Sequence, residues 1–430
     1  SLKYHSSFPP GKIKIDSSKP CKTQSDLTLS YTPGVAAPCL EIAKTPDGVW
    51  KYTNRGNTVA IVTDGTAVLG LGDIGPEAGL PVMEGKAVLF KKFADIDAYP
   101  LCYKFENKTL ENFVMAVKAL EPCMGGINLE DVAAPFCFEL QEKMDAEMDI
   151  PVFHDDQDGT AIIITGGLMN ALKITNKDLK NIKIVMNGAG AAGIAIARLL
   201  LEFGVKKEQL FICDSKGLLA TERTDLNPQK LEFAQHGASA QLPEVMKGAD
   251  VFIGVSVAGA VNQDMVKVMN SDAIVFAVAN PTPEIMPADA IAAGARIVAT
   301  GRSDFPNQVN NSLGFPGIFR GALDTRSKTV NTKMKMAASE ALASLINEPI
   351  PQNIKEILEK AYPAETEIFS RENPLSEKYI IPKQFDLRVV PRVARMVAKA
   401  AMESGVARIQ IPDLDSYEKE VFERIIKNWI

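Results

Sequence analysis

The chain has 430 residues, of which 46% are hydrophobic and 23% are charged, and its formal net charge is −6. These proportions are typical of a soluble globular protein, and the length favours two or more domains. The slightly acidic balance and the lack of a long basic run argue against nucleic acid as a partner. The longest apolar runs, such as residues 273–279, are too short to span a bilayer, so we also expect no membrane association.

The cysteines of the chain are scattered and form no C-x-x-C pair; they are Cys21, Cys39, Cys102, Cys123, Cys137 and Cys213. In a chain of this length, that pattern is typical of reduced thiols rather than of a disulfide framework or a zinc site. No charged and then apolar signal segment opens the chain. We therefore expect a cytoplasmic protein.

The first part of the chain predicts a polar arm followed by mixed helices and strands. Residues 1–25 are polar and proline-containing, which predicts an extended arm. In residues 57–75, a β-branched apolar run is followed by Asp-Gly and further glycines, a pattern that predicts a strand, a turn and a second short strand. Residues 149–156, DIPVFHDD, predict another short strand that ends in a cluster of acids.

A long apolar segment follows this acidic cluster. Residues 159–174, GTAIIITGGLMNALKI, fit a buried helix better than a strand because of their length. Asp158 stands just before the segment, where a carboxylate can accept hydrogen bonds from the free amides of a first helical turn. We therefore interpret Asp158 as a helix cap rather than as a catalytic acid.

Strands and helices alternate from residue 180 onward. Apolar runs predict strands at 182–187, 209–214, 250–256, 273–280 and 295–301, and residues 194–204 predict a helix. Continuous apolar strands that alternate with helices are typical of a parallel sheet covered on both faces. The predicted fold class is α/β, with a Rossmann-type doubly wound parallel sheet domain behind a mixed α/β N-terminal substrate domain. The C-terminal part is expected to be largely helical.

A glycine motif follows the first of these strands. Gly188, Gly190 and Gly193 form G-x-G-x-x-G, with Ala191 and Ala192 between the last two glycines. A lone match is weak, but this one follows a predicted strand and opens a predicted helix, as the motif requires. Such glycines let the backbone approach a pyrophosphate beside a helix N-terminus. The motif therefore predicts a dinucleotide site; a structural glycine turn is the alternative.

Polar residues end the neighbouring strands. Asp214 ends the second strand, about 20 residues beyond the glycines, where an acid can bind the adenosine ribose. Ser256 and Asn280 end the next two strands. Because ligands of an open parallel sheet lie beyond the carboxyl ends of its strands, we expect these residues to line a nicotinamide cofactor.

The choice between NAD and NADP stays open at this point. Asp214 would repel a 2′-phosphate, which favours NAD. Ser215, Lys216 and Arg223 follow closely, however, and could accept that phosphate. Both cofactors are therefore carried forward.

Carboxylates are better candidates for the chemistry than histidines. Only His154 of the three histidines lies near other reactive groups, which gives little support to a simple His–Asp dehydrogenase. Adjacent acids occur at Glu130 and Asp131, and again at Asp155 and Asp156. Hard oxygen ligands of this kind suit magnesium or manganese, although adjacent acids taken singly are usually a solvated turn.

Seven stretches of the chain together resemble the malic enzyme family, specifically its shorter, bacterial-type branch. They are SYTPGVAAPCLEI (30–42), the long segment 60–100, INLEDVAAPFCF (127–138), PVFHDDQDGTA (151–161), VMNGAGAAG (185–193), AVANPTPE (277–284) and NQVNNSLGFPGIFRGALD (307–324). The resemblance covers nearly the whole chain. It implies oxidation of malate with release of carbon dioxide, which yields pyruvate and NADH or NADPH.

The resemblance also implies roles for single residues. It implies divalent-metal ligands at Glu130, Asp131 and Asp156, a neighbouring active-site acid at Asp155, a proton donor at Tyr31, a general base at Lys86, and amides that reach substrate or nicotinamide at Asn280 and Asn311. A lysine can act as a base if its surroundings lower its pKa, and a nearby metal cation would do so. Without the surrounding motifs, Lys86 would be interpreted as a surface lysine and Tyr31 as a packed aromatic residue.

One position departs from the larger members of the family. They carry an arginine for a substrate carboxylate in the TDG loop, where this chain has Thr66 and Ala67. The contact to that carboxylate is left unassigned, with Asn280, Asn311 and the metal as candidates. Shorter members share this feature.

We expect residues 1–160 to form the substrate and metal domain, residues 161–380 the cofactor domain, and residues 381–430 helices that pack back on the first domain. The resemblance implies a homodimer. We also expect no acyltransferase-like extension, which some bacterial members of the family carry. Two alternatives remain: a malolactic-type reaction, which would convert malate to lactate, and a protein that senses the dinucleotide without turnover.

Overall fold

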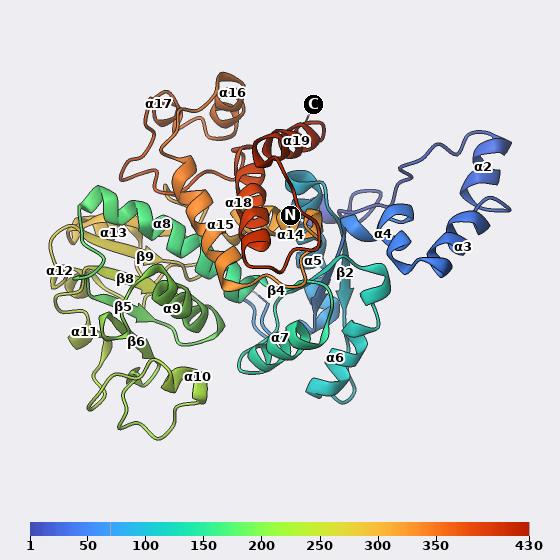
Figure 1. Cartoon of the computed structure of the whole chain (residues 1–430). Helices are drawn as coiled ribbons and strands as arrows, with labels where there is room; N and C mark the ends of the chain where they lie inside the picture. The colour runs from blue at the N-terminus through green and yellow to red at the C-terminus, as the bar shows by residue number, and fades with distance from the viewer. Residues whose placement is uncertain (69, 430) are drawn as a thin grey trace.

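The computed structural model describes residues 1–68 and 70–429 and contains two sheets, one in each half of the chain. Figure 1 shows them side by side, with α14 (Phe315–Asp324), α15 (Thr332–Leu345) and α18 (Val389–Glu403) between them. The predicted α/β class with a Rossmann-type sheet is confirmed. Within the described residues, no helix is both long and apolar enough to cross a membrane.

The first sheet has four parallel strands in the order β2-β1-β3-β4. Its strands are β1 (Thr58–Thr63), β2 (Asp97–Cys102), β3 (Gly126–Leu129) and β4 (Val152–His154). The short helix η2 (Arg55–Asn57) precedes β1, and the strands are connected through α5 (Pro76–Ala94), α6 (Leu110–Lys118), η3 (Glu121–Cys123) and α7 (Phe136–Glu147). Every residue of the two central strands is buried, which explains their continuous apolar sequence. All four strands therefore end at the same edge of the sheet.

The second sheet has six strands in the order β10-β9-β8-β5-β6-β7. They are β5 (Ile184–Asn187), β6 (Leu210–Asp214), β7 (Gly217–Leu218), β8 (Val251–Gly254), β9 (Ala273–Ala277) and β10 (Ala295–Thr300). The helices of this half are α8 (Thr160–Thr175), α9 (Ala191–Phe203), η5 (Lys207–Gln209), α10 (Pro228–Leu231), α11 (Leu242–Val245), α12 (Gln263–Lys267) and α13 (Pro287–Ala292). All strand pairs are parallel except β6 with β7, so the five predicted strands form one parallel sheet with a short antiparallel edge.

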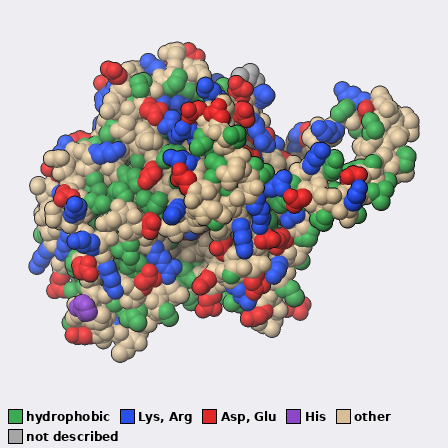
Figure 2. Space-filling view, in the orientation of Figure 1, with side chains coloured by type: hydrophobic (Ala, Val, Ile, Leu, Met, Phe, Trp, Pro, Cys, Tyr) green, Lys and Arg blue, Asp and Glu red, His purple; other side chains and the backbone are tan. Residues whose placement is uncertain are grey.

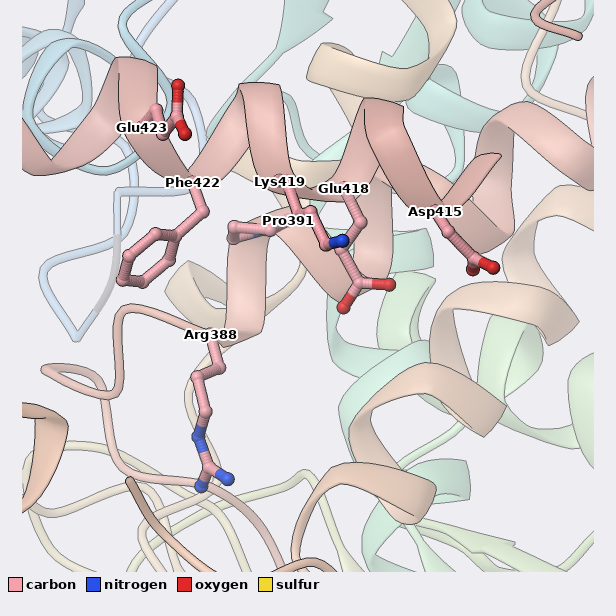
Figure 3. Close-up of a pocket in the computed structure, with 7 residues that line it drawn as sticks. All are labelled: Arg388, Pro391, Asp415, Glu418, Lys419, Phe422 and Glu423. Carbon is pink, nitrogen blue, oxygen red and sulfur yellow. The ribbon is translucent and has the colours of Figure 1, made fainter. Parts of the chain in front are cut away.

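The C-terminal part is helical, as expected. It contains η6 (Asn311–Leu313), α14, α15, α16 (Gln352–Ala361), α17 (Thr366–Phe369), α18 and α19 (Leu414–Ile426). Helix α18 packs against α14, α15 and α19. Figure 3 shows a groove between α18 and α19, lined by residues such as Arg388 and Glu418. Both are already ion-paired, Arg388 with Asp386 and Glu418 with Arg392.

Residues 24–44 of the N-terminal part, with α2 (Gln24–Ser30) and α3 (Ala36–Lys44), project from the rest of the molecule; the other helices of this part are α1 (Leu2–Ser6), η1 (Pro46–Gly48) and α4 (Val49–Tyr52). The chain after α1 lies against α5, where the Lys12 amide donates a hydrogen bond to Glu84 at 3.0 Å. In Figure 1, α2 and α3 lie far to one side of both sheets, and their residues are exposed or only partly buried. The predicted arm thus contains short helices as well as extended chain.

Two local predictions were wrong. Among the described residues of 57–75, no second strand follows the Asp-Gly turn; residues 70–75 fold back on Gly65, whose carbonyl accepts hydrogen bonds from Ile74 and Gly75. Asp158 does not cap α8. A π-helical turn, η4 (Asp155–Gly159), leads directly into that helix, and the Asp158 carboxylate instead accepts hydrogen bonds from Gln141 and Lys335, 2.7 Å away in each case.

Candidate active site

The carboxylates meet because two neighbouring strands end together. Leu129 and His154, the last residues of β3 and β4, are register partners. Glu130 and Asp131 follow the first strand, and the η4 turn with Asp156 follows the second. One ligand atom from each of Glu130, Asp131 and Asp156 lies within 4.8 Å of the others. The two acidic pairs of the sequence thus form a single cluster.

Lys86 supplies the positive charge inside this cluster. It is buried on α5, its Nζ lies 2.8 Å from Glu130 Oε1, and it also forms an ion pair with Asp155. The same ammonium group lies 4.3 Å from the centre of the Phe315 ring. Since both carboxylates and the aromatic face favour the charged form, they outweigh burial and raise the pKa of Lys86.

The cluster nevertheless keeps an excess of negative charge. Burial and the neighbouring acids raise the pKa of Asp131 to about 8, whereas burial, partly offset by Lys86, raises that of Asp155 to about 7. Asp131 Oδ2 and Asp155 Oδ1 are buried and have no hydrogen-bond partner among the described residues. Orphaned carboxylate oxygens of this kind fit a hard divalent cation.

Two further residues of the cluster were missed by the sequence reasoning. Asn128 donates a hydrogen bond of 2.9 Å to Glu130 Oε2, and Phe315 covers Lys86. Asn128 stands two residues before Glu130, so the two-residue period of a strand would have placed both on one side. Phe315 lies in one of the stretches that carry the family resemblance, but no residue pattern linked it to Lys86, because it comes from a helix far along the chain.

The TDG loop packs directly against the cluster. Ala67 donates its backbone N–H to the carbonyl of Asp131 at 2.9 Å. The Thr66 hydroxyl donates to Asp64 at 2.7 Å and accepts from the Ala133 amide at 3.0 Å. Asp64 is itself ion-paired with Lys108. The loop therefore buttresses the cluster through its backbone.

The glycine motif lies where a strand passes into a helix, as expected. Gly188 follows β5, and Ala191 and Ala192 open α9. A Cβ on Gly193 would lie 1.9 Å from the Gly188 carbonyl oxygen, whereas a Cβ on Gly190 would meet no atom of the described residues within 4 Å. Gly193 is thus needed for packing, and Gly190 faces open space that a pyrophosphate can use.

Asp214 is more heavily engaged than the sequence suggested. One carboxylate oxygen accepts from the Lys216 amide and Arg223 Nη1, each at 2.9 Å, and the other accepts from Arg223 Nη2 at 3.0 Å and Lys230 Nζ at 2.8 Å. Burial opposes the charged form, but these donors lower the pKa of Asp214 to about 2. Ser215 is exposed beside it.

Ser256 and Asn280 follow the adjacent strands β8 and β9. A Cβ on Gly70, in the glycine-rich loop of the first half, would lie 3.4 Å from the Asn280 carbonyl oxygen. A Cβ on Gly159 would lie 3.1 Å from the Cβ atom of Asn311, which stands at the start of η6. The two halves therefore approach each other around Asn280 and Asn311, next to the turn that carries Asp155.

Tyr31 does not join these residues within the subunit. It ends α2, its side chain is 69% exposed, and α2 belongs to the projecting segment of Figure 1. The structure therefore brings together every other predicted catalytic and metal residue but leaves Tyr31 apart.

The fold and the site define a dinucleotide-binding α/β protein with an acidic cluster at the carboxyl edge of a second parallel sheet. The chain matches two family models, "Malic enzyme, N-terminal domain" over residues 10–145 and "Malic enzyme, NAD binding domain" over residues 157–368. The chain belongs to the malic enzyme family, and the predicted resemblance is confirmed.

Similar proteins are named malic enzymes, some of them NADP-dependent and others NAD-dependent, as in Geobacillus stearothermophilus (48% identical over 93% of this chain and 78% of that relative). The chain is 51% identical to a probable NADP-dependent malic enzyme of Rickettsia prowazekii over 99% of its own length, but spans only 54% of that relative. It is 52% identical to a bifunctional malic/malolactic enzyme of Bacillus subtilis, with 95% of this chain and 94% of the relative aligned. The crystal structure of malic enzyme from Pyrococcus horikoshii superposes with a TM-score of 0.88 at 43% identity, covering 100% of this chain and 95% of that one.

Proposed function

We propose that this protein oxidises malate and releases carbon dioxide, forming pyruvate while reducing NAD or NADP. The observation that carries the proposal is the position of Lys86 between Glu130 and Asp155, in a buried carboxylate cluster with orphaned oxygens. The open space at Gly190 of the glycine motif, and the approach of the Gly70 loop to Asn280, support a dinucleotide site near this cluster. The malic enzyme family and its named relatives support the same reaction.

A divalent cation held by Glu130, Asp131 and Asp156 would supply a Lewis acid for the substrate carbonyl. Lys86 takes the hydroxyl proton of malate as hydride leaves for the dinucleotide. Because Glu130 and Asp155 hold Lys86 in its charged form, it can act as a base only when other positive charge engages these carboxylates. Carbon dioxide then leaves, and a tyrosine hydroxyl protonates the resulting enolate at carbon.

We propose that this tyrosine comes from a second copy of the chain. The projecting segment exposes a set of apolar side chains, namely Leu27, Leu29, Tyr31, Val35 and Leu40. Figure 2 shows hydrophobic side chains along this segment, interspersed with basic ones. A homodimer in which each segment covers the other subunit would bury these side chains and bring Tyr31 of the partner subunit to the carboxylate cluster.

The direct test is absorbance at the reduced nicotinamide band with malate, Mn²⁺ and either NAD or NADP. Lys86→Met should lower the oxidation rate by roughly 100- to 10,000-fold, the usual contribution of an acid–base group. Lys92→Met is the matched control, because it removes an exposed lysine of the same helix and should leave the rate unchanged.

Other outcomes would separate the alternatives. Malate consumption with lactate as product and no net NADH or NADPH would indicate a malolactic reaction, the activity that the name of the Bacillus relative includes. Dinucleotide binding without any turnover would indicate a sensor. A normal rate in Lys86→Met would remove Lys86 from the role of base.

A further inference from the structure

Glu284, a buried carboxylate outside the acidic cluster, lies at the ends of β8 and β9, where we expect the nicotinamide half of the cofactor. In the sheet order, β6 with Asp214 lies on one side of β5, and β8 and β9 lie on the other. With the pyrophosphate at the glycine motif after β5 and the adenosine ribose toward β6, the nicotinamide half must extend over the ends of β8 and β9. Ser256 and Asn280 stand at these two ends.

Glu284 connects these ends. Its side chain is 0% exposed. Oε1 accepts hydrogen bonds from the Ser256 amide at 2.7 Å and the Ser256 hydroxyl at 3.1 Å, and Oε2 accepts from the Ala279 amide at 3.0 Å. One carboxylate therefore holds the backbone of the second residue after β8 and of the residue before Asn280.

The surroundings of Glu284 are shaped to hold it. A Cβ on Gly254, the last residue of β8, would lie 2.4 Å from the Glu284 carboxyl carbon, so only glycine leaves room there. Asn187, the last residue of β5, donates a hydrogen bond of 2.8 Å to the Ser256 hydroxyl and extends the connection to a third strand. The hydrogen bonds thus join the end of β5, which precedes the glycine motif, to the ends of β8 and β9.

Packing alone does not account for this arrangement. Burying a carboxylate costs free energy that an apolar side chain would not, unless its hydrogen bonds compensate. Of the ion pairs formed among residues 1–68 and 70–429, none includes Glu284. Within the described residues, its carboxylate accepts hydrogen bonds from three donors, all at the two strand ends. The residue is therefore used where it sets the geometry of these ends.

We propose that Glu284 is a positioning residue for the nicotinamide half of the cofactor. It acts through Ser256 and through the backbone that carries Asn280, and it fixes the distance between the ends of β8 and β9. The inference depends on one part of the proposed function, namely that the cofactor is a nicotinamide dinucleotide. It concerns binding geometry and can therefore be tested without turnover.

The test compares NADH with ADP-ribose, which lacks the nicotinamide, in calorimetric titrations without malate. Glu284→Gln puts an N–H₂ group against a backbone N–H and should weaken NADH binding about tenfold, while ADP-ribose binding stays within about twofold. Glu284→Asp keeps the charge but is too short to reach both loops, so its loss should be smaller. Glu208→Gln is the control, because it changes an exposed glutamate before β6, at the opposite edge of the sheet.

Equal loss for NADH and ADP-ribose, or no loss for either, would overturn the proposal and leave Glu284 a structural residue. Hydrogen exchange in the wild-type chain gives an answer even if the variants do not fold. The amides of Ser256 and Ala279 should exchange slowly without cofactor, and fast exchange would show that Glu284 does not hold the loops. If the wild-type chain binds neither ligand, the proposed function fails instead.

Discussion

Single residues of the acidic cluster show how burial changes the protonation of carboxyl groups. Glu130, Asp131 and Asp155 lie almost entirely out of solvent, and Lys86 provides one positive charge for them. Burial raises the pKa of each of these carboxyls, to about 7 for Glu130 and Asp155 and about 8 for Asp131. In the metal-free protein they therefore hold protons at a pH at which the unfolded chain has lost them.

This difference predicts how stability depends on pH. Because the folded state binds more protons than the unfolded state between about pH 4 and pH 8, the metal-free protein loses stability as pH rises through that window. The melting temperature in chelator should fall by about 5 °C or more from pH 5 to pH 8, and Mn²⁺ should restore more stability at pH 8 than at pH 5. Differential scanning calorimetry measures both effects.

Asp131→Asn gives the control for this prediction. It removes the carboxyl with the highest pKa of the three, so the pH dependence in chelator should become shallower and Mn²⁺ should stabilise less. If Mn²⁺ raised the melting temperature of this variant as much as that of the wild type, Asp131 would not be a ligand.

The contacts of Asp214 predict a preference for NADPH over NADH, to which Lys230 contributes. All four acceptor positions of its carboxylate are filled by Lys216, Arg223 and Lys230, which leaves none for a ribose hydroxyl. We expect the two lysines of this group, the exposed Lys216 and the partly buried Lys230, to accept a 2′-phosphate. Lys230→Met should weaken NADPH binding about tenfold and change NADH binding less than about twofold, as measured by nicotinamide fluorescence.

Lys207→Met is the matched control, since Lys207 lies in η5 before β6, at the other end of the strand that carries Asp214. A wild-type chain that binds NADH more tightly than NADPH, or a Lys230→Met variant that loses both equally, would contradict the prediction.

At the scale of elements, the sequence predicted the helices and strands whose formation depends on local residue patterns. The apolar runs placed the parallel strands because fully buried strands carry such runs. The loop after β1 escaped prediction because its path depends on glycines with positive φ, such as Gly65 and Gly75. The capping interpretation of Asp158 failed because its partners Gln141 and Lys335 come from other elements.

The same limit applies to the candidate site. Residue types and spacing found the two acidic pairs and the glycine motif. Other features of the site depend on contacts between distant segments: Lys86 lies between Glu130 and Asp155, and Glu284 spans two strand ends. The spacing of residues along the chain does not predict such contacts.

Two glycines of the β5–α9 turn should respond differently to the same substitution. Gly190→Ala adds a methyl group to open space, so it should weaken dinucleotide binding about tenfold or more and leave the melting temperature nearly unchanged. Gly193→Ala drives a methyl group against the Gly188 carbonyl and should cost about 1–3 kcal/mol of stability. Calorimetry and thermal melting distinguish the two; a destabilised Gly190→Ala would refute the open site.

At the scale of the whole molecule, the two sheets meet through their carboxyl edges, and the helices between them hold this arrangement. Helix α14 carries Phe315 to Lys86, and its Arg320 pairs with Asp324, which also accepts a hydrogen bond from Tyr417 of α19. The C-terminal helices therefore connect to the catalytic region through α14. The projecting segment is the one part of the described chain that stands outside this arrangement in Figure 1.

That projecting segment has a genetic consequence if Tyr31 serves the other subunit. A Tyr31→Phe chain and a Lys86→Met chain would each be inactive as homodimers. A mixed dimer would contain one site with both residues intact and one with both lost, so two null alleles expressed together should restore about one quarter of wild-type activity at random pairing. Two such alleles would fail to complement if every site drew both residues from a single chain.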